Sequence, residues 1–258
     1  MRRVLLRPRW VIGSVIVVLI AVLFVNLGFW QLRRLHERRH HNAVVKERAA
    51  ALQPLPADGW LPSPAANPDD LAYRRVRVTG TYDPSKELLV RFQTRNGTSG
   101  YDVVTPLVTA DGVVLVDRGW VPLQMGRSWP DRSAAAPSGT VSVQGLLDAG
   151  PDGSLRAAHD ISGGPLVVGA VDAKALRSTL GYPRLYAVPL LLDAGERQTT
   201  GASFPVPPPA PDLSEGPHLS YALQWFSFTI IGVVGWLFVL RRALRDAAKE
   251  PAATPAPG

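Results

Sequence analysis

Residues 10–30 read WVIGSVIVVLIAVLFVNLGFW, and this stretch decides the fold because it contains no charged side chain. At about 1.5 Å per residue, a helix over it is about 30 Å long, the thickness of a bilayer's hydrocarbon core. Tryptophan stands at each end, where the aromatic belt of a membrane helix lies. The run is longer than the apolar part of a secretory signal, and no small-residue cleavage site follows it. We therefore predict an uncleaved transmembrane anchor.

A second uncharged run, LSYALQWFSFTIIGVVGWLFVL, covers residues 219–240 and ends at a pair of arginines. Basic residues follow this run, and none lies between Arg197 and its start, so the positive-inside rule places the C-terminus in the cytoplasm. Two spans then place both termini there and the large intervening domain outside. The first span disagrees, since residues 33–48 are more basic than residues 1–9, but flanking charges govern a long translocated domain less.

The composition excludes several classes of protein. The chain of 258 residues has no cysteine, which removes thiolate nucleophiles, cysteine-ligated metals and disulfides together. Its net charge of +7 does not indicate nucleic-acid binding, because the basic residues crowd beside the two apolar runs, where anionic lipid headgroups attract them. We expect a lipid bilayer and no nucleic acid among its partners.

Between the spans, the pattern of apolar residues predicts strands. Residues 75–79 alternate polar and apolar side chains, and an Asp111-Gly112 hairpin signal separates two apolar runs. One short helix is predicted over residues 172–180, with Asp172 as its N-cap and Gly181 ending it. We predict a membrane protein in which two transmembrane α-helices flank a mainly antiparallel β domain, barrel- or sandwich-like, on the extracytoplasmic side.

The predicted boundaries follow the changes in composition along the chain. They are 1–9 for a cytoplasmic end, 10–30 for the first span, 31–72 for a basic helix and proline-rich linker, 73–196 for the β-rich domain, 197–217 for a second proline-rich linker, 218–240 for the second span and 241–258 for a cytoplasmic tail.

The GxSxG, P-loop and GxGxxG patterns are absent from the sequence. His159, Asp160 and Ser162 are neighbours along the chain, which does not make them a catalytic triad. His36 and His40 stand one helical turn apart and are able to share a metal, although a basic face beside lipid headgroups explains them as well. We therefore expect no enzymatic activity and no catalytic residue.

His218 stands at the start of the second span, with Tyr221 and Trp225 at i+3 and i+7 on the same helix face. One interpretation is an interfacial aromatic belt that begins with a histidine. The other is a neutral imidazole held ready to ligate a metal or haem iron, with aromatic walls beside it. The residue types leave both interpretations open.

Arg118 lies in Asp117-Arg118-Gly119-Trp120, which closes an otherwise apolar strand. In a structural role, its guanidinium pairs with Asp117 or stacks on Trp120. In a binding role, it faces an anion such as a haem propionate or a partner's carboxylate.

Several segments, taken in order, resemble a known family. They are LGFWQLRRL at 27–35, RRVRVTGTY at 74–82, KEL at 86–88, GYDVVTPL at 100–107, VDRGWVP at 116–122 and HLSYALQWF at 218–226. Together they resemble the Surfeit-locus-one family of cytochrome c oxidase assembly factors. Each segment alone is weak, and their shared order makes the resemblance specific.

The resemblance implies two spans, cytoplasmic termini and a role in maturing haem-copper terminal oxidases. It implies haem a as a transiently bound cofactor, with His218 as the ligand of its iron. Tyr221 and Trp225 are then walls of the site, and Arg118 a propionate or partner contact. The expected partners are the catalytic subunit of cytochrome c oxidase and other assembly factors. Because no transit peptide precedes Trp10, we expect a bacterial plasma membrane.

The main alternative is a membrane scaffold that binds no haem and uses the same residues to dock and stabilise the nascent oxidase subunit. An envelope hydrolase is a weaker alternative. A membrane sensor is weaker still, because about nine and eighteen cytoplasmic residues leave no room for an output domain.

Overall fold

The computed structural model describes residues 7–148, 159–160, 165–193 and 203–249. The chain divides into two compact units. One unit combines the two ends of the chain, Met1–Asn42 and Leu213–Gly258, and the other is the intervening Ala43–Asp212.

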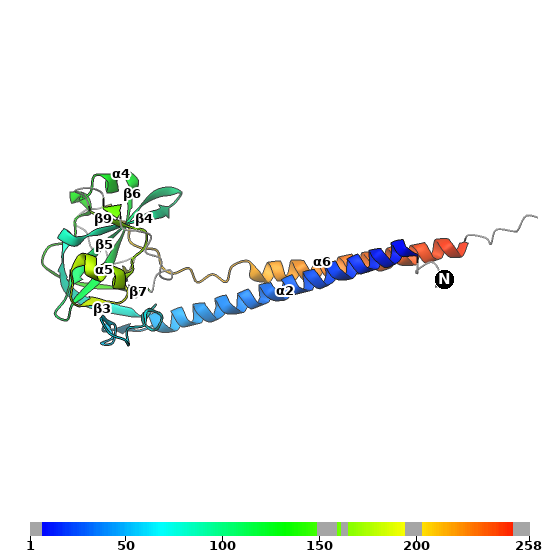
Figure 1. Ribbon diagram of the computed structural model, residues 1–258, viewed down its shortest axis with the longest axis horizontal. Coiled ribbons are helices and arrows are strands. Elements are labelled where there is room, and N and C mark those ends of the chain that lie inside the picture. Colours follow the sequence, from blue (N-terminus) through cyan, green and yellow to red (C-terminus); the bar gives the residue numbers. More distant parts are fainter. Residues whose placement is uncertain (1–6, 149–158, 161–164, 194–202, 250–258) are drawn as a thin grey trace, which may run out of the picture. The chain divides into compact units, whose positions relative to one another are not determined.

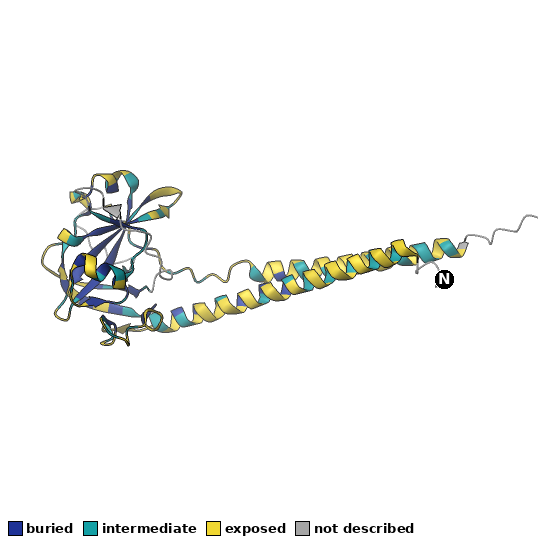
Figure 2. Cartoon of the chain, viewed as in Figure 1, coloured by how far each residue is buried: buried dark blue, intermediate teal, exposed yellow. Residues whose placement is uncertain are grey.

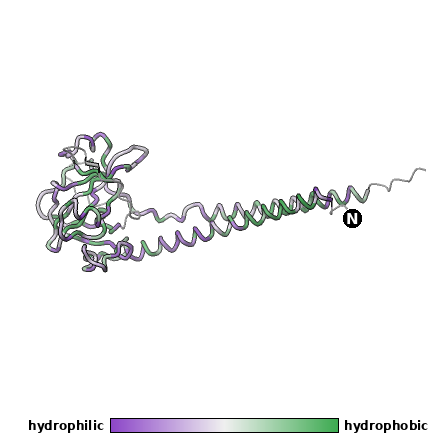
Figure 3. The backbone as a smooth tube through the Cα atoms, in the orientation of Figure 1, coloured by the Kyte–Doolittle hydropathy of each residue, from purple (hydrophilic) through white to green (hydrophobic). Residues whose placement is uncertain are grey.

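Two long helices form the unit made from the ends of the chain. Helix α2 spans Pro8–Ala49 and helix α6 spans His218–Lys249, and both are long and apolar enough to cross a membrane by length and composition. Most of their apolar side chains are exposed, as the yellow ribbon of the two helices in Figure 2 shows, and the green part of the tube in Figure 3 marks where both helices are apolar. Exposed apolar side chains all round a helix are expected where lipid is the solvent. Helix α2 continues past residue 30 and includes the basic stretch of residues 33–48.

Helices α2 and α6 pack through glycines that receive aromatic rings. A Cβ added to Gly13 would lie 2.5 Å from the Trp236 ring, and one added to Gly28 would lie 2.5 Å from the Phe226 ring. By contrast, a Cβ added to Gly232 or Gly235 of α6 meets no described atom within 4 Å. The contact between the two helices therefore uses the small residues of α2.

The intervening unit is built on a closed five-stranded barrel (Figure 1). Its strands pair in the order β6–β11–β7–β3–β5, and β5 returns to β6 to close the ring. They span β3 Arg75–Tyr82, β5 Thr98–Val108, β6 Val113–Pro122, β7 Thr140–Leu147 and β11 Leu190–Leu192. The expectation of a barrel-like β domain is confirmed.

Six further strands extend this sheet beyond the barrel among the described residues. On one side, β4 Leu88–Arg95 pairs with β5, β9 Leu166–Val168 with β4 and β8 His159–Asp160 with β9. On the other side, β10 Leu185–Tyr186 pairs with β6 and β2 Trp60–Leu61 with β10. Strand β1 Leu52–Gln53 pairs with β3. The predicted antiparallel character holds for most pairs, but β1–β3, β10–β6, β11–β6 and β4–β9 are parallel. Parallel neighbours need long crossover connections. Hairpin signals along the chain do not reveal which strands such connections join.

The helices of this unit are short. Helix α5 spans Ala173–Leu180, and it is the helix that the sequence predicts: Asp172 Oδ1 accepts a hydrogen bond from the backbone N–H of Ala175, and Gly181 takes a left-handed φ of 68°. The sequence predicted one short helix, but further short helical segments are present. They are α3 Pro68–Leu71, α4 Leu123–Arg127 and 3-10 turns at 84–86 and 132–134. Runs of three to five residues carry no periodic signal.

Both segments that we expected to be proline-rich linkers contribute to this unit. Trp60 and Leu71, from the first, are 7% and 2% exposed and belong to a buried cluster of the barrel. From the second, Phe204 stacks against Trp120 with ring centroids 6.4 Å apart, and Val206 pairs with the backbone of Trp120. Proline content indicates an irregular backbone, but it does not reveal whether that backbone packs against a core.

Candidate functional site

His218 is the first residue of α6 and lies at the contact between α6 and α2. A turn precedes it, in which Gly216 has φ 68° and the carbonyl of Pro217 accepts the N–H of Tyr221 at 3.1 Å. Glycine adopts such a left-handed conformation without steric cost. The helix therefore starts abruptly, with the imidazole in its first turn.

Gln31 of α2 fixes the imidazole of His218. Its side-chain oxygen Oε1 lies 2.8 Å from His218 Nδ1, and Gln31 itself is 9% exposed. A carbonyl oxygen only accepts hydrogen bonds, so Nδ1 carries the proton and the lone pair of the neutral ring is on Nε2. No side chain in the described part of the chain hydrogen-bonds to Nε2. This is the arrangement in which histidine ligates metals, with the second ring nitrogen held by a hydrogen bond.

Tyr221 and Trp225 differ in their surroundings, although sequence spacing places them on one helix face with His218. The Trp225 ring lies 5.2 Å from the Phe24 ring of α2, centroid to centroid, so it is part of the contact between the helices. The Tyr221 side chain is 45% exposed and free to contact a ligand. The structure thus brings His218 and Trp225 together against α2 and leaves Tyr221 on the open flank.

The segment just before α6 is tied to the basic part of α2. Arg39 makes two hydrogen bonds to the Glu215 carboxylate, at 2.9 and 2.8 Å. The Asn42 side-chain amide donates to the Leu213 carbonyl at 2.7 Å, and Arg38 Nε donates to the Ser214 carbonyl at 3.1 Å. These contacts hold the entry to α6, and hence His218, in place. Sequence reasoning missed them because the partners are more than 170 residues apart.

The other histidines do not form a site among the described residues. His36 and His40 are exposed on α2, and no group of three or more His, Asp or Glu side chains in the described ranges is arranged to hold a metal ion. His159 and Asp160 form the short strand β8, whereas Ser162 lies outside the described residues.

Arg118 lies inside the β domain, where it has a structural role with a partner other than the expected Asp117 or Trp120. The register of β5 against β6 slips at this residue, because Val103 faces Gly119 while Val104 faces Asp117. Its side chain is 0% exposed and its ion-pair partner is Glu87, with Arg118 Nη2 2.8 Å from Glu87 Oε2.

The Arg118–Glu87 pair is the centre of a buried network. Arg118 also donates to Thr105 Oγ1 at 2.8 Å and to the Ala134 carbonyl at 2.9 Å, and Trp129 Nε1 donates to Glu87 Oε1 at 2.9 Å. A bulge turns the bulged residue to one side, and here it turns the arginine into the core. Buried and bonded in this way, Arg118 has no surface with which to contact a haem propionate or a partner carboxylate.

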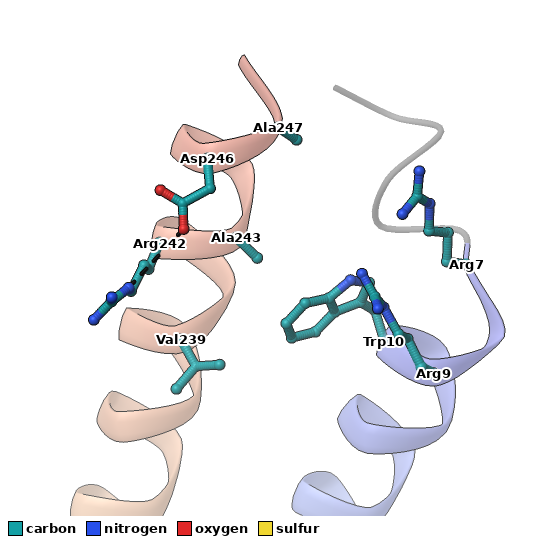
Figure 4. Close-up of a pocket in the computed structure, with 8 residues that line it drawn as sticks. All are labelled: Arg7, Arg9, Trp10, Val239, Arg242, Ala243, Asp246 and Ala247. Atoms are coloured by element: carbon teal, nitrogen blue, oxygen red, sulfur yellow. Dashed lines mark ion pairs between the residues drawn. The ribbon is translucent and has the colours of Figure 1, made fainter. Parts of the chain in front are cut away.

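A separate pocket of about 400 Å³ lies between the N-terminal end of α2 and the C-terminal end of α6 (Figure 4). Arg7, Arg9 and Arg242 give it a positive character, and Asp246 lies 3.9 Å from Arg242. The Arg9 guanidinium stacks over the Trp10 ring at 5.4 Å. Tryptophan and arginine together at a helix end are typical of a membrane interface.

Comparison with known proteins matches residues 18–230 to the SURF1 family. The chain belongs to the SURF1 family. The SURF1 match includes Gln31, Arg118 and His218, so it covers both sides of the histidine site as well as the barrel.

Individual SURF1 relatives align over most of their length. A SURF1-like protein of Mycobacterium tuberculosis is 28% identical over 255 residues, which is 98% of this chain and 91% of the relative. A SURF1-like protein of Monosiga brevicollis is 31% identical over 239 residues, 86% and 85% of the two chains. One from Caenorhabditis elegans is 26% identical over 261 residues, 91% and 76%. The resemblance deduced from the sequence is thereby confirmed.

Proposed function

We propose that this SURF1 protein is a non-enzymatic assembly factor for a haem-copper terminal oxidase, and that it holds haem a for the catalytic subunit. Membership of the SURF1 family supports a general role in oxidase assembly. Custody of haem a is the finer step, and it rests on the geometry at His218.

One observation carries the proposal: the hydrogen bond from His218 Nδ1 to Gln31 Oε1, at 2.8 Å. It leaves Nε2 as the donor atom for haem iron and prevents the ring from rotating away. Tyr221, 45% exposed on the next turn, is the residue able to contact the porphyrin edge. Arg118 is excluded from this site by its burial in the barrel.

The proposed location is a bacterial plasma membrane, with α2 and α6 as the two spans and both termini in the cytoplasm. The length and apolar surface of both helices support membrane anchoring. The arginines near Trp10 and after residue 240 suit a cytoplasmic leaflet with anionic lipids. A green-fluorescent-protein fusion at the C-terminus is expected to fluoresce, whereas a C-terminal alkaline phosphatase fusion should be inactive. The opposite pattern contradicts this topology.

The test of haem custody is the visible spectrum of detergent-purified full-length protein from cells that make haem a. We expect a Soret band in the wild type, its loss in His218→Ala and its retention in His40→Ala, a matched change at an exposed histidine of α2. In Gln31→Leu the ring loses its acceptor, so the band should shift or weaken rather than match the wild type.

A scaffold without haem is the second candidate, and one observation favours it. Trp225 is stacked on Phe24 instead of forming an open wall, so the aromatic surface of the site is partly filled by protein. Wild-type protein without a Soret band, together with immature oxidase when the gene is deleted, would replace haem custody with docking of the nascent subunit.

A further inference from the structure

A recess in the β domain contains carboxylates that are not part of the histidine site. It has a volume of about 270 Å³, and its charged lining comes from Asp102 of β5, Asp117 of β6, Asp148 after β7 and Arg95 of β4. Val171, Leu191 and Pro208 contribute apolar wall. We call this the acidic recess, because three carboxylates face one guanidinium among its described lining residues.

The two central carboxylates of the acidic recess are buried with little compensation. Asp102 is 7% exposed, and its Oδ1 has no hydrogen-bond partner among the described residues; Arg95 Nη2 lies 3.8 Å away, which is too long for one. Asp117 is 8% exposed, and its Oδ1 accepts the N–H of Gly119 at 2.8 Å. Burial raises the pKa of both carboxyls, and the nearby Asp102 raises that of Asp117 further. A bound cation would supply the missing partner.

The shape of the acidic recess selects the kind of cation. No group of acidic or histidine side chains within the described ranges is arranged for a metal ion. A volume of about 270 Å³ is also much larger than a bare ion needs. Apolar wall beside carboxylates instead suits a flexible alkyl stem that ends in a charged donor group. Guanidinium and ammonium groups on such stems are the ends of arginine and lysine side chains.

An exposed aromatic residue stands beside lining residues of the acidic recess along strand β4. Phe92 lies between Val90 and Gln93, which both line the recess, where the register of β4 on β5 is interrupted. It is 73% exposed and has φ 67°, a conformation that bulky residues rarely adopt. A large apolar side chain held outward beside a desolvated polar pocket is typical of a protein–protein contact.

We propose that the acidic recess binds an arginine or lysine side chain of a partner protein, with Phe92 as the apolar contact beside it. The partner's cationic end reaches Asp102 and Asp117, and its alkyl stem lies along the apolar wall. The recess contains none of the residues that hold haem a in the proposed function. Failure of either proposal therefore leaves the other standing.

The first experiment measures binding of butylguanidinium to full-length protein in detergent by isothermal titration calorimetry. We expect saturable binding that is at least tenfold weaker in Asp102→Asn and in Asp117→Asn. Asparagine has the same shape and keeps an oxygen able to accept the Gly119 hydrogen bond, and far-ultraviolet circular dichroism verifies folding. Asp111→Asn, the same change at an exposed position of the β5–β6 turn, should bind like wild type. Equal affinity in all variants, or binding of neutral butylurea as tight as butylguanidinium, overturns the proposal.

The second experiment asks whether the ligand is a partner's side chain or a free small cation. The photo-crosslinker p-benzoylphenylalanine replaces Phe92 in growing cells, and the crosslinked peptide is sequenced by mass spectrometry. We expect an arginine or lysine within two residues of the link, and a several-fold lower yield when Asp102→Asn is added but not when Asp111→Asn is added. A peptide without a nearby basic residue, or a yield insensitive to Asp102, rejects the partner, even if butylguanidinium binds.

Discussion

Replacing Glu87 with leucine should strongly destabilise the β domain, because the change leaves a cation buried without its partner. Glu87 is 8% exposed, and its carboxylate accepts hydrogen bonds from Arg118, Thr105 and Trp129. The Arg118 guanidinium cannot lose its proton in a protein, and its side chain is 0% exposed. In Glu87→Leu the charge therefore remains in the core while its counter-ion is gone.

The size of the effect follows from this burial. Removing one partner of a buried ion pair costs about 3–5 kcal/mol of unfolding free energy. At about 2–4 °C per kcal/mol for a domain of this size, the thermal midpoint should fall by about 6–20 °C. The double variant Glu87→Leu/Arg118→Met should regain most of this loss, since replacing both partners with apolar residues is often close to neutral. Arg77→Met, at an exposed position of β3, should change the midpoint by less than about 2 °C.

Thermal unfolding of the full-length protein in detergent, followed by tryptophan fluorescence, measures these midpoints. Trp129 donates a hydrogen bond to Glu87 at 2.9 Å, so one of the seven tryptophans that contribute to the emission is part of the network. The reasoning is refuted if Glu87→Leu behaves like Arg77→Met. It is refuted equally if the double variant is as unstable as the two single variants added together, because the charge then contributes nothing.

Three further changes test the contact between α2 and α6, the packing of the barrel and the effect of the buried carboxylates. Gly28→Leu should lower the thermal midpoint, because a Cβ there lies 2.5 Å from the Phe226 ring. Gly232→Leu is the control, since a Cβ there meets no described atom within 4 Å. Equal midpoints in the two variants contradict the described contact between α2 and α6. Gly119→Ala should cost about 1–3 kcal/mol from backbone strain alone, since φ is 122°, and more because the new Cβ would lie 2.1 Å from the Val206 carbonyl oxygen. Gly97→Ala has only the strain (φ 77°, no described atom within 4 Å), so urea midpoints that are equal in the two variants rule out the contact with Val206. Burial raises the pKa of Asp117 well above 3.8, and the negative charge of Asp102 raises it further. Of the other nearby charges, Arg95 lowers this pKa and Asp148 raises it. The stability that Asp117 contributes is thus complete below pH 3.8 and is lost as pH rises through its folded pKa. Asp117→Asn should remove this loss of stability with rising pH. Urea unfolding curves of the variant with the same pH dependence as wild type contradict this prediction.

Local patterns determined the elements of this protein. Two uncharged runs predicted α2 and α6, because helix length and the absence of charge are properties of neighbouring residues. The caps of α5 at Asp172 and Gly181 were predicted for the same reason, since each cap bonds within one turn. The ordered segments that resemble the family also lie along the chain, and the family match confirms them.

The tertiary structure decided which of these elements meet. It closes β6 against β11 in parallel, which no hairpin signal encodes, and it packs Trp60 of an expected linker into the barrel core. It also pairs Arg118 with Glu87 instead of with its neighbour Asp117, because a bulge in β6 turns the arginine to the opposite side.

The histidine site shows the division between sequence and tertiary structure most clearly. The sequence identified His218 as a candidate ligand from its place at the start of an apolar helix. Its tautomer depends on Gln31, 187 residues away, and that contact exists only because two helices lie side by side. Periodicity and capping act within a few residues, so a sequence reveals them. The proton on Nδ1, the burial of Arg118 and the acidic recess arise where distant surfaces meet, and only the folded chain determines which surfaces do.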